Sequence, residues 1–127
     1  VDTVVESEWK WSDDGNFLLG EFYVKRQGQG ARQGSHRIGW DPQRRQFRSW
    51  LFDAEGGFAE GYWTGGGDVW TVRLTACLSD GTCAAGTLMY ERDGEDALIV
   101  SQLGRNAGGE ALPDVAARVV RTPPEPK

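Results

Sequence analysis

The chain has 127 residues, a formal net charge of −5 and six tryptophans, and at this length we expect one domain with its own core. Acidic and basic residues are interspersed along it, so the sequence lacks the basic patch that nucleic acid requires, and we exclude nucleic acid as a partner. No apolar run approaches the ~20 residues that span a bilayer, and no signal peptide is visible.

Taken in order, the chain predicts about eight or nine β-strands and no helix. The expected strands alternate apolar and polar residues, or are apolar on both faces, and they end at glycine, proline, aspartate or asparagine turns. Between them, residues 27–34 predict a mobile hairpin tip, residues 104–114 predict a loop, and residues 122–127 predict a Pro-rich flexible tail. The expected strands span residues 4–12, 17–26, 35–40, 47–53, 58–64, 69–78, 82–92, 96–103 and 115–121.

Residues 35–64 are the centre of this pattern, because they hold three consecutive strands joined by tight turns. Strands that follow one another through hairpins usually lie side by side in space. We therefore expect an all-β fold, an antiparallel up-and-down meander of about eight or nine strands that curls into a barrel. Residues 1–121 would form this single domain.

The length of the loop between the two cysteines determines the register of one hairpin. We expect residues 79–81 to form a three-residue loop with a left-handed glycine. Cys77 then lies opposite Cys83, and Trp70 lies opposite Tyr90, whereas a two-residue loop would place the two sulfurs on opposite faces. The first register predicts an outer-face disulfide and hence an extracytoplasmic or secreted protein. The alternative is two free thiols in a cytoplasmic strand. A zinc site is not expected, because the chain has no second cysteine pair.

The run RIGWDPQRRQFRSWLFDAEGGFAEGYW, followed by GDVWTV and later by GGEALPD, resembles the β-rich C-terminal half of certain bacterial proteins. The N-terminal half of those proteins is a SnoaL-like domain. The resemblance covers residues 9–124, and its motifs are structural, without a catalytic residue to carry over. It implies a lipocalin-like (calycin-like) antiparallel barrel.

Two departures from that family bear on partners. Its members usually begin with an additional Gly-x-Trp strand before the segment that matches residues 4–12, and the SnoaL-like half is not part of this sequence. The resemblance therefore implies a barrel that is open at one edge. Another copy of the chain, or an N-terminal SnoaL-like domain, could add a strand there.

An aromatic-lined interior would suit a small apolar ligand, since aromatic side chains wall such pockets in barrels. The same side chains can also fill a barrel completely, and this alternative stays open. His36 and Arg48 are candidates for a polar anchor. The predicted ligand-binding residues are Trp9, Trp11, His36, Trp40, Arg48, Trp70 and Tyr90.

Three further candidates each have an ordinary structural explanation. His36 could ligate haem or a metal, but a lone histidine is more often a hydrogen-bonded core residue. Glu60 could act as a general base, or it could pair with an arginine. An anion could be held by a set of arginines that otherwise form a solvated strand face: Arg37, Arg44, Arg45 and Arg48. We predict no catalytic residue, no metal site and no cofactor.

The sequence leaves three functions. The first, which we prefer, is a non-enzymatic binding or accessory barrel that holds a small apolar ligand, and it predicts a closed barrel with a lined pocket. The second is a structural module that is completed by strand addition at an open edge, giving an oligomer or filament. The third is an enzyme, which requires His36 and Glu60 to converge within hydrogen-bond reach.

Overall fold

The computed structural model describes residues 3–26 and 29–122, and within them it contains ten β-strands and no helix. The strands are β1 (Thr3–Trp11), β2 (Phe17–Arg26), β3 (Gln29–Asp41), β4 (Gln46–Asp53), β5 (Phe58–Gly66), β6 (Val69–Cys77), β7 (Cys83–Arg92), β8 (Ala97–Ala107), β9 (Glu110–Ala111) and β10 (Val115–Val120). The alternating segments of the sequence therefore fold as strands.

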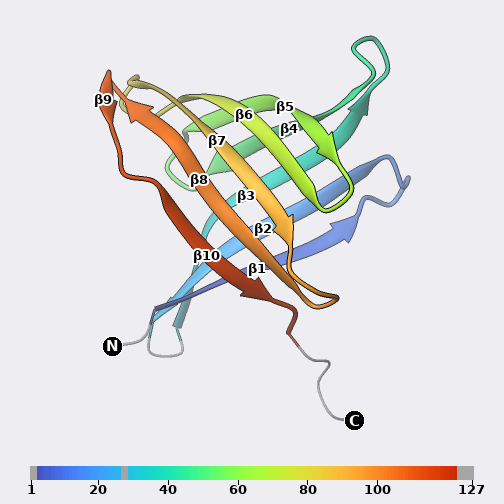
Figure 1. Cartoon of the computed structure of the whole chain (residues 1–127). Coiled ribbons are helices and arrows are strands. Elements are labelled where there is room, and N and C mark those ends of the chain that lie inside the picture. Colours follow the sequence, from blue (N-terminus) through green and yellow to red (C-terminus); the bar gives the residue numbers. More distant parts are fainter. Residues whose placement is uncertain (1–2, 27–28, 123–127) are drawn as a thin grey trace.

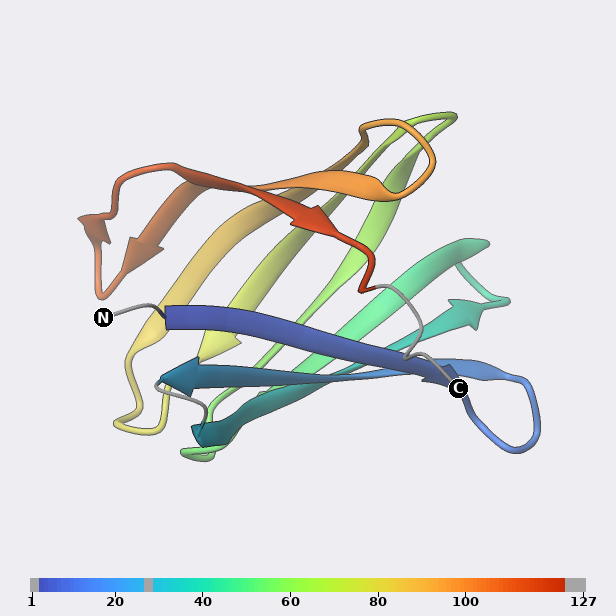
Figure 2. The same ribbon diagram turned by 90° about the horizontal axis from the view of Figure 1, so that it is seen from below.

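All the strands belong to one antiparallel sheet, in the order β1-β2-β3-β4-β5-β6-β7-β8-β10. The short strand β9 lies off this path and pairs with β8. The sheet curls strongly, and β1 and β10 form the two borders of an opening (Figure 1 and Figure 2). These two border strands are not paired with each other. The expected all-β, up-and-down meander is confirmed, and it takes the form of an open half-barrel.

The hairpin between β6 and β7 has the register that the turn residues predict. Gly81 adopts a left-handed conformation, with φ of 87°, and its amide donates a hydrogen bond to the carbonyl of Leu78. Only a residue that tolerates positive φ fits this position without strain. Cys77 accordingly pairs with Cys83, and the same ladder pairs the apolar residues along the whole hairpin.

Two segments that we expected to be loops are largely strand. β3 begins at Gln29, so most of residues 29–34 pair with β2, in a ladder that continues past a bulge at Phe22 and Tyr23. β8 likewise extends to Ala107 and turns directly into β9. In both places the backbone hydrogen bonds of an existing ladder outweigh the polar, glycine-rich composition. Residues 27 and 28, and the expected tail from residue 123 onward, lie outside the described residues.

Side chains alternate along each strand, so the register divides them between two faces of the sheet. One face carries the fully buried side chains of His36, Ser49 and Val72, and we call this concave side the inner face. The strand pairings place Trp63 and Tyr90 on the same side. The opposite, convex side is the outer face.

The half-barrel buries little apolar surface for its size. Among the described residues, only Val72 and Ala97 are both apolar and buried. The chain exposes 9223 Å², roughly a third more than the ~6,700 Å² typical of a folded monomer of 14.0 kDa. Nine of the sixteen exposed large apolar side chains lie on the inner face: Val5, Trp9, Trp11, Trp40, Phe47, Trp70, Leu98, Val115 and Val119. The inner face is therefore an incomplete core.

Candidate functional site

A row of aromatic rings crosses the inner face from β1 to β7. Trp9, Gly20 and His36 lie opposite one another on β1, β2 and β3. The Trp9 ring lies across Gly20, where an added Cβ would come within 2.6 Å of it, and meets the edge of His36 with 5.2 Å between ring centroids. Trp63 stacks on the other side of His36 at 6.5 Å, and Tyr90 follows at 5.2 Å from Trp63. Glycine at position 20 thus allows Trp9 to cover His36.

Three of the inner side chains form a buried hydrogen-bonded chain. The indole Nε1–H of Trp63 donates to Ser49 Oγ at 2.6 Å, and Ser49 Oγ lies 2.7 Å from His36 Nε2. Ser49 accepts a hydrogen bond from Trp63 and has one hydroxyl hydrogen of its own. It therefore donates this hydrogen to His36 Nε2, which acts as the acceptor. This assignment puts the imidazole hydrogen on Nδ1, which is buried and has no partner among the described residues.

Burial lowers the pKa of His36 from 6.5 to about 4. Its ring neighbours are Trp9, Phe22 and Trp63, which cannot stabilise an imidazolium by charge. Protonation would also turn Nε2 into a donor, so that the Ser49 hydroxyl hydrogen would lose its acceptor. The neutral ring is therefore part of the fold rather than a proton-transfer group working near pH 7.

We expect the stability of the protein to fall as the pH drops from 7 to 5. The unfolded chain binds a proton at His36 with a pKa near 6.5, whereas the folded chain binds it only near 4, so acid favours the unfolded state between these values. The loss due to His36 is about 2 kcal/mol over this range. Urea denaturation at both pH values measures it, and a His36→Gln variant should lack this part of the loss. Equal losses in both proteins would contradict the prediction.

Six of the seven predicted ligand-binding residues lie together on the inner face. Trp9, His36 and Tyr90 belong to the aromatic row. The side chains of Trp11 and Trp40 are 65% and 51% exposed near one end of the half-barrel. The sixth, Trp70, pairs with Tyr90 at that same end. Sequence reasoning did not select Ser49 and Trp63, although both have the inward parity of their strands.

Arg48, the seventh predicted residue, lies on the outer face. Its guanidinium pairs with Glu60 at 2.9 Å and lies over the rings of Trp50 and Tyr62 at 5.0 and 5.1 Å. Glu60 is therefore paired with an arginine, on the opposite side of the sheet from His36. The two groups on which the enzyme hypothesis rests do not converge.

Of the other candidate arginines, Arg44 shares the Tyr62 ring with Arg48, whereas Arg37 contacts a different ring. Arg44 lies over Tyr62 at 4.2 Å, and Arg37 lies over Phe17 at 5.3 Å, both as cation–π contacts. Arg45 occupies the turn after β3 with a positive φ of 57°. This arrangement is that of a solvated face rather than an anion site.

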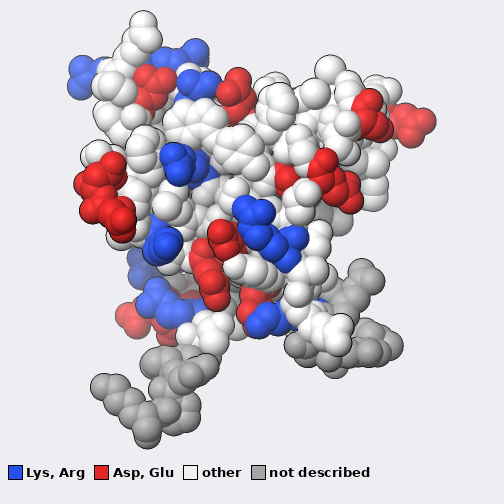
Figure 3. Space-filling view, turned by 180° about the vertical axis from the view of Figure 1, so that it is seen from behind, with Lys and Arg blue, Asp and Glu red and all other residues white. Residues whose placement is uncertain are grey.

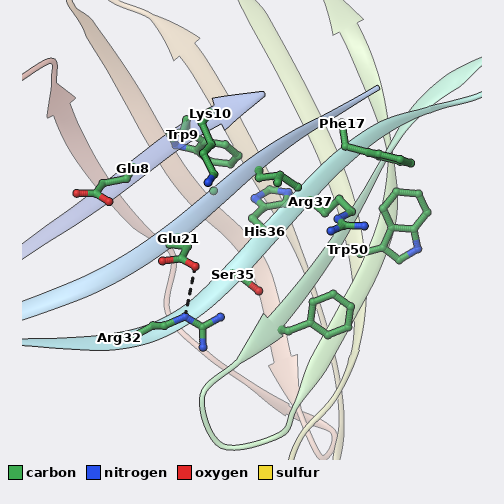
Figure 4. Close-up of a pocket in the computed structure, with 13 residues that line it drawn as sticks. Glu8, Trp9, Lys10, Phe17, Glu21, Arg32, Ser35, His36, Arg37 and Trp50 are labelled. Carbon is green, nitrogen blue, oxygen red and sulfur yellow. Dashed lines mark ion pairs between the residues drawn. The ribbon is translucent and has the colours of Figure 1, made fainter. Parts of the chain in front are cut away.

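A groove of about 860 Å³ lies over the outer face of β1 to β4 (Figure 4). Its lining includes the apolar side chains of Leu19, Trp50 and Phe52 and charged side chains of both signs, among them the Glu21–Arg32 ion pair at 3.8 Å. Of the seven predicted residues, only Trp9 and His36 contribute to its lining, and their side chains belong to the other face. The groove thus lies on the outer face and is not the predicted interior.

Cys77 and Cys83 lie directly opposite each other on the outer face, next to the turn between β6 and β7. Cα atoms of directly opposed strand residues are about 4.5–5.5 Å apart, which is within the range of a disulfide. Both are free thiols in this structure. The register is confirmed, and the bond stays a prediction.

The described residues offer no cluster of three or more His, Cys, Asp or Glu side chains that could hold a metal ion. Nor do residues 3–26 and 29–122 contain a helix long and apolar enough to cross a membrane. Lysines, arginines and carboxylates are interspersed on the face that Figure 3 shows, with white apolar and neutral areas between them.

No family model, no curated protein and no solved structure matches this chain. The open, all-strand antiparallel half-barrel is compatible with a lipocalin-like barrel, and this compatibility lies in the architecture alone.

Proposed function

We propose that the chain is a non-enzymatic binding module that takes up an apolar guest on its open inner face. The observation that carries this proposal is the exposed inner apolar set, nine large side chains on a sheet that buries only two apolar residues. Apolar surface of this extent on a small domain is typical of a binding surface. The lipocalin-like interpretation, with its resemblance to the C-terminal half of SnoaL-like-domain proteins, belongs to the same proposal, since barrels of that kind bind guests internally.

The absence of a converging catalytic pair supports a binding role over chemistry. His36 lies within the sheet packing, with 2% of its surface exposed, and Glu60 pairs with Arg48 on the outer face. A different observation, the two unpaired borders β1 and β10, favours the second candidate, a module that is completed by an added strand. A disulfide between Cys77 and Cys83 would place the protein in an oxidising compartment.

The proposal is tested with the dye 1-anilinonaphthalene-8-sulfonate and two variants. Replacing Trp11 and Trp40 by serine removes exposed inner surface, and we expect at least a fivefold loss of dye fluorescence enhancement. The matched control replaces Phe52 and Phe58, which are exposed to a similar degree on the outer face, and should retain most of the signal. Equal losses in both variants, or no dye binding at all, would refute an inner-face site.

A further inference from the structure

The number of strands determines how the opening can be closed. The path from β1 to β10 contains nine strands, and every neighbouring pair is antiparallel. β1 and β10 therefore run in the same direction, as Figure 2 shows. One additional strand, antiparallel to both, would give a closed barrel with antiparallel pairing throughout. Up-and-down barrels that close in this way have an even number of strands.

The border of β1 presents free backbone groups to the opening. The amide of Ser12 donates to the carbonyl of Phe17 at 2.8 Å, which marks a hydrogen-bonded pair at the end of the β1–β2 ladder. Because such pairs alternate in antiparallel strands, the even-numbered residues of β1 bond to β2. The backbone groups of its odd-numbered residues point away from β2, into the opening. These residues are Thr3, Val5, Ser7, Trp9 and Trp11.

The border of β10 also presents free backbone groups to the opening, from the other side. The amide of Arg121 donates to the carbonyl of Asp96 at 2.8 Å, so the odd-numbered residues of β10 bond to β8. The N–H and C=O groups of its even-numbered residues, Ala116, Arg118 and Val120, point into the opening. Within residues 3–26 and 29–122, two rows of unpaired donors and acceptors thus flank one gap.

The side chains along the two borders define what would fit between them. On the inner side, β1 offers Val5 and Trp11, which are 68% and 65% exposed, and β10 offers Val115 and Val119, which are 44% and 41% exposed. A strand that fills the gap would therefore present apolar side chains inward at every second position. Its length would be at least that of β10, six residues.

We propose that the guest of this module is one extended polypeptide segment, not contained in residues 1–127, which binds as a tenth strand antiparallel to both β1 and β10. The proposal rests on the function proposed above and specifies its partner as a strand with alternating apolar residues. Main-chain hydrogen bonds would supply affinity on both borders, and the inner apolar positions would supply selectivity.

A second copy and residues 123–127 are both poorer candidates for the gap. A folded second copy presents an edge strand that is already attached to a curled sheet, so it would pair with one border and leave the other unfilled. Residues 123–127 include three prolines, which lack the N–H that a ladder requires. A single free strand satisfies both borders together.

The test uses a synthetic peptide, acetyl-KTVTVTVTVK-amide, and a twin in which alternate residues carry N-methyl groups. Native mass spectrometry and tryptophan fluorescence should show a 1:1 complex with the first peptide. The N-methylated twin has the same side chains but fewer backbone N–H donors, so it should bind at least tenfold more weakly than the first peptide. Equal binding of the two peptides would overturn strand addition and leave an apolar guest site.

Two protein variants test the two borders separately. Ser7→Pro and Ala116→Pro each remove an N–H that points into the opening and bonds to neither β2 nor β8. The protein without peptide should therefore keep its fold, and far-UV circular dichroism and urea denaturation can verify this. Each should weaken peptide binding at least tenfold, while the controls Ser7→Ala and Ala116→Ser should leave it unchanged. An effect of only one proline would mean that the peptide binds one border, which contradicts a bridging strand. Stable oligomers without peptide would assign the gap to a second copy and equally overturn the proposal.

Discussion

Replacing Ser49 by alanine should cost about 3 kcal/mol of the free energy of unfolding. The side chain is fully buried and connects two other inner groups, since it accepts from Trp63 and lies within hydrogen-bond distance of His36. Without the hydroxyl, the indole N–H of Trp63 and the buried Nε2 of His36 both lose their hydrogen-bond partner. Each such loss costs about 1–3 kcal/mol. Urea denaturation followed by tryptophan fluorescence measures the change.

Ser101 provides the matched control for this variant. It is another buried serine, 6% exposed, but on the outer face, and its hydroxyl forms no hydrogen bond within the described part of the chain. Ser101→Ala should therefore change the free energy of unfolding by less than about 1 kcal/mol. If the two alanine variants were equally stable, the buried chain from Trp63 to His36 would not contribute to the fold.

Gly61→Ala should destabilise the protein by about 4 kcal/mol or more, enough to unfold a marginal domain. Gly61 lies in the middle of β5, between Ser49 on β4 and Leu74 on β6. A Cβ at this position would lie 2.0 Å from the carbonyl oxygen of Arg73 and 3.3 Å from Cα of Leu74. Both contacts are to backbone, which cannot move aside as a flexible side chain can, so the β5–β6 ladder would have to separate.

The same strand offers a control, because an added Cβ at Gly66 would meet nothing within 4 Å and Gly66 has no positive φ. We expect Gly66→Ala to retain the wild-type free energy of unfolding to within about 0.5 kcal/mol. A Gly61→Ala protein that unfolded at the same urea concentration as Gly66→Ala would show that the two strands can separate without cost.

The fold was largely predictable, because its information is local. Each hairpin is fixed by its own turn and by alternation over a few residues, as the pairing of Cys77 with Cys83 through Gly81 shows. The exceptions are segments whose composition indicated a loop but which pair with a neighbouring strand. The glycines of residues 29–34 indicated a loop, but pairing with β2 decided the structure.

The candidate site was less predictable, because it depends on which face each strand turns inward. On β4 both faces carry aromatic residues, Phe47 on one and Trp50 on the other, so alternation does not show which side Arg48 occupies. Ser49 was missed for a related reason. Its hydrogen bond to His36 depends on the register across the turn after Asp41, and no pattern within either strand specifies that register.

The way the strands are connected also affects how fast the chain folds. Every pairing on the path joins strands that follow one another, apart from the step that passes over the two-residue β9. Because β1 and β10 do not pair, no strand pairing among the described residues requires the closure of a loop as long as the chain. Short sequence separations between paired strands favour rapid folding for a β-protein, one hairpin after another. The slow step of pairing the first strand with the last is not required. The chain can therefore reach the half-barrel without waiting for its two ends to meet.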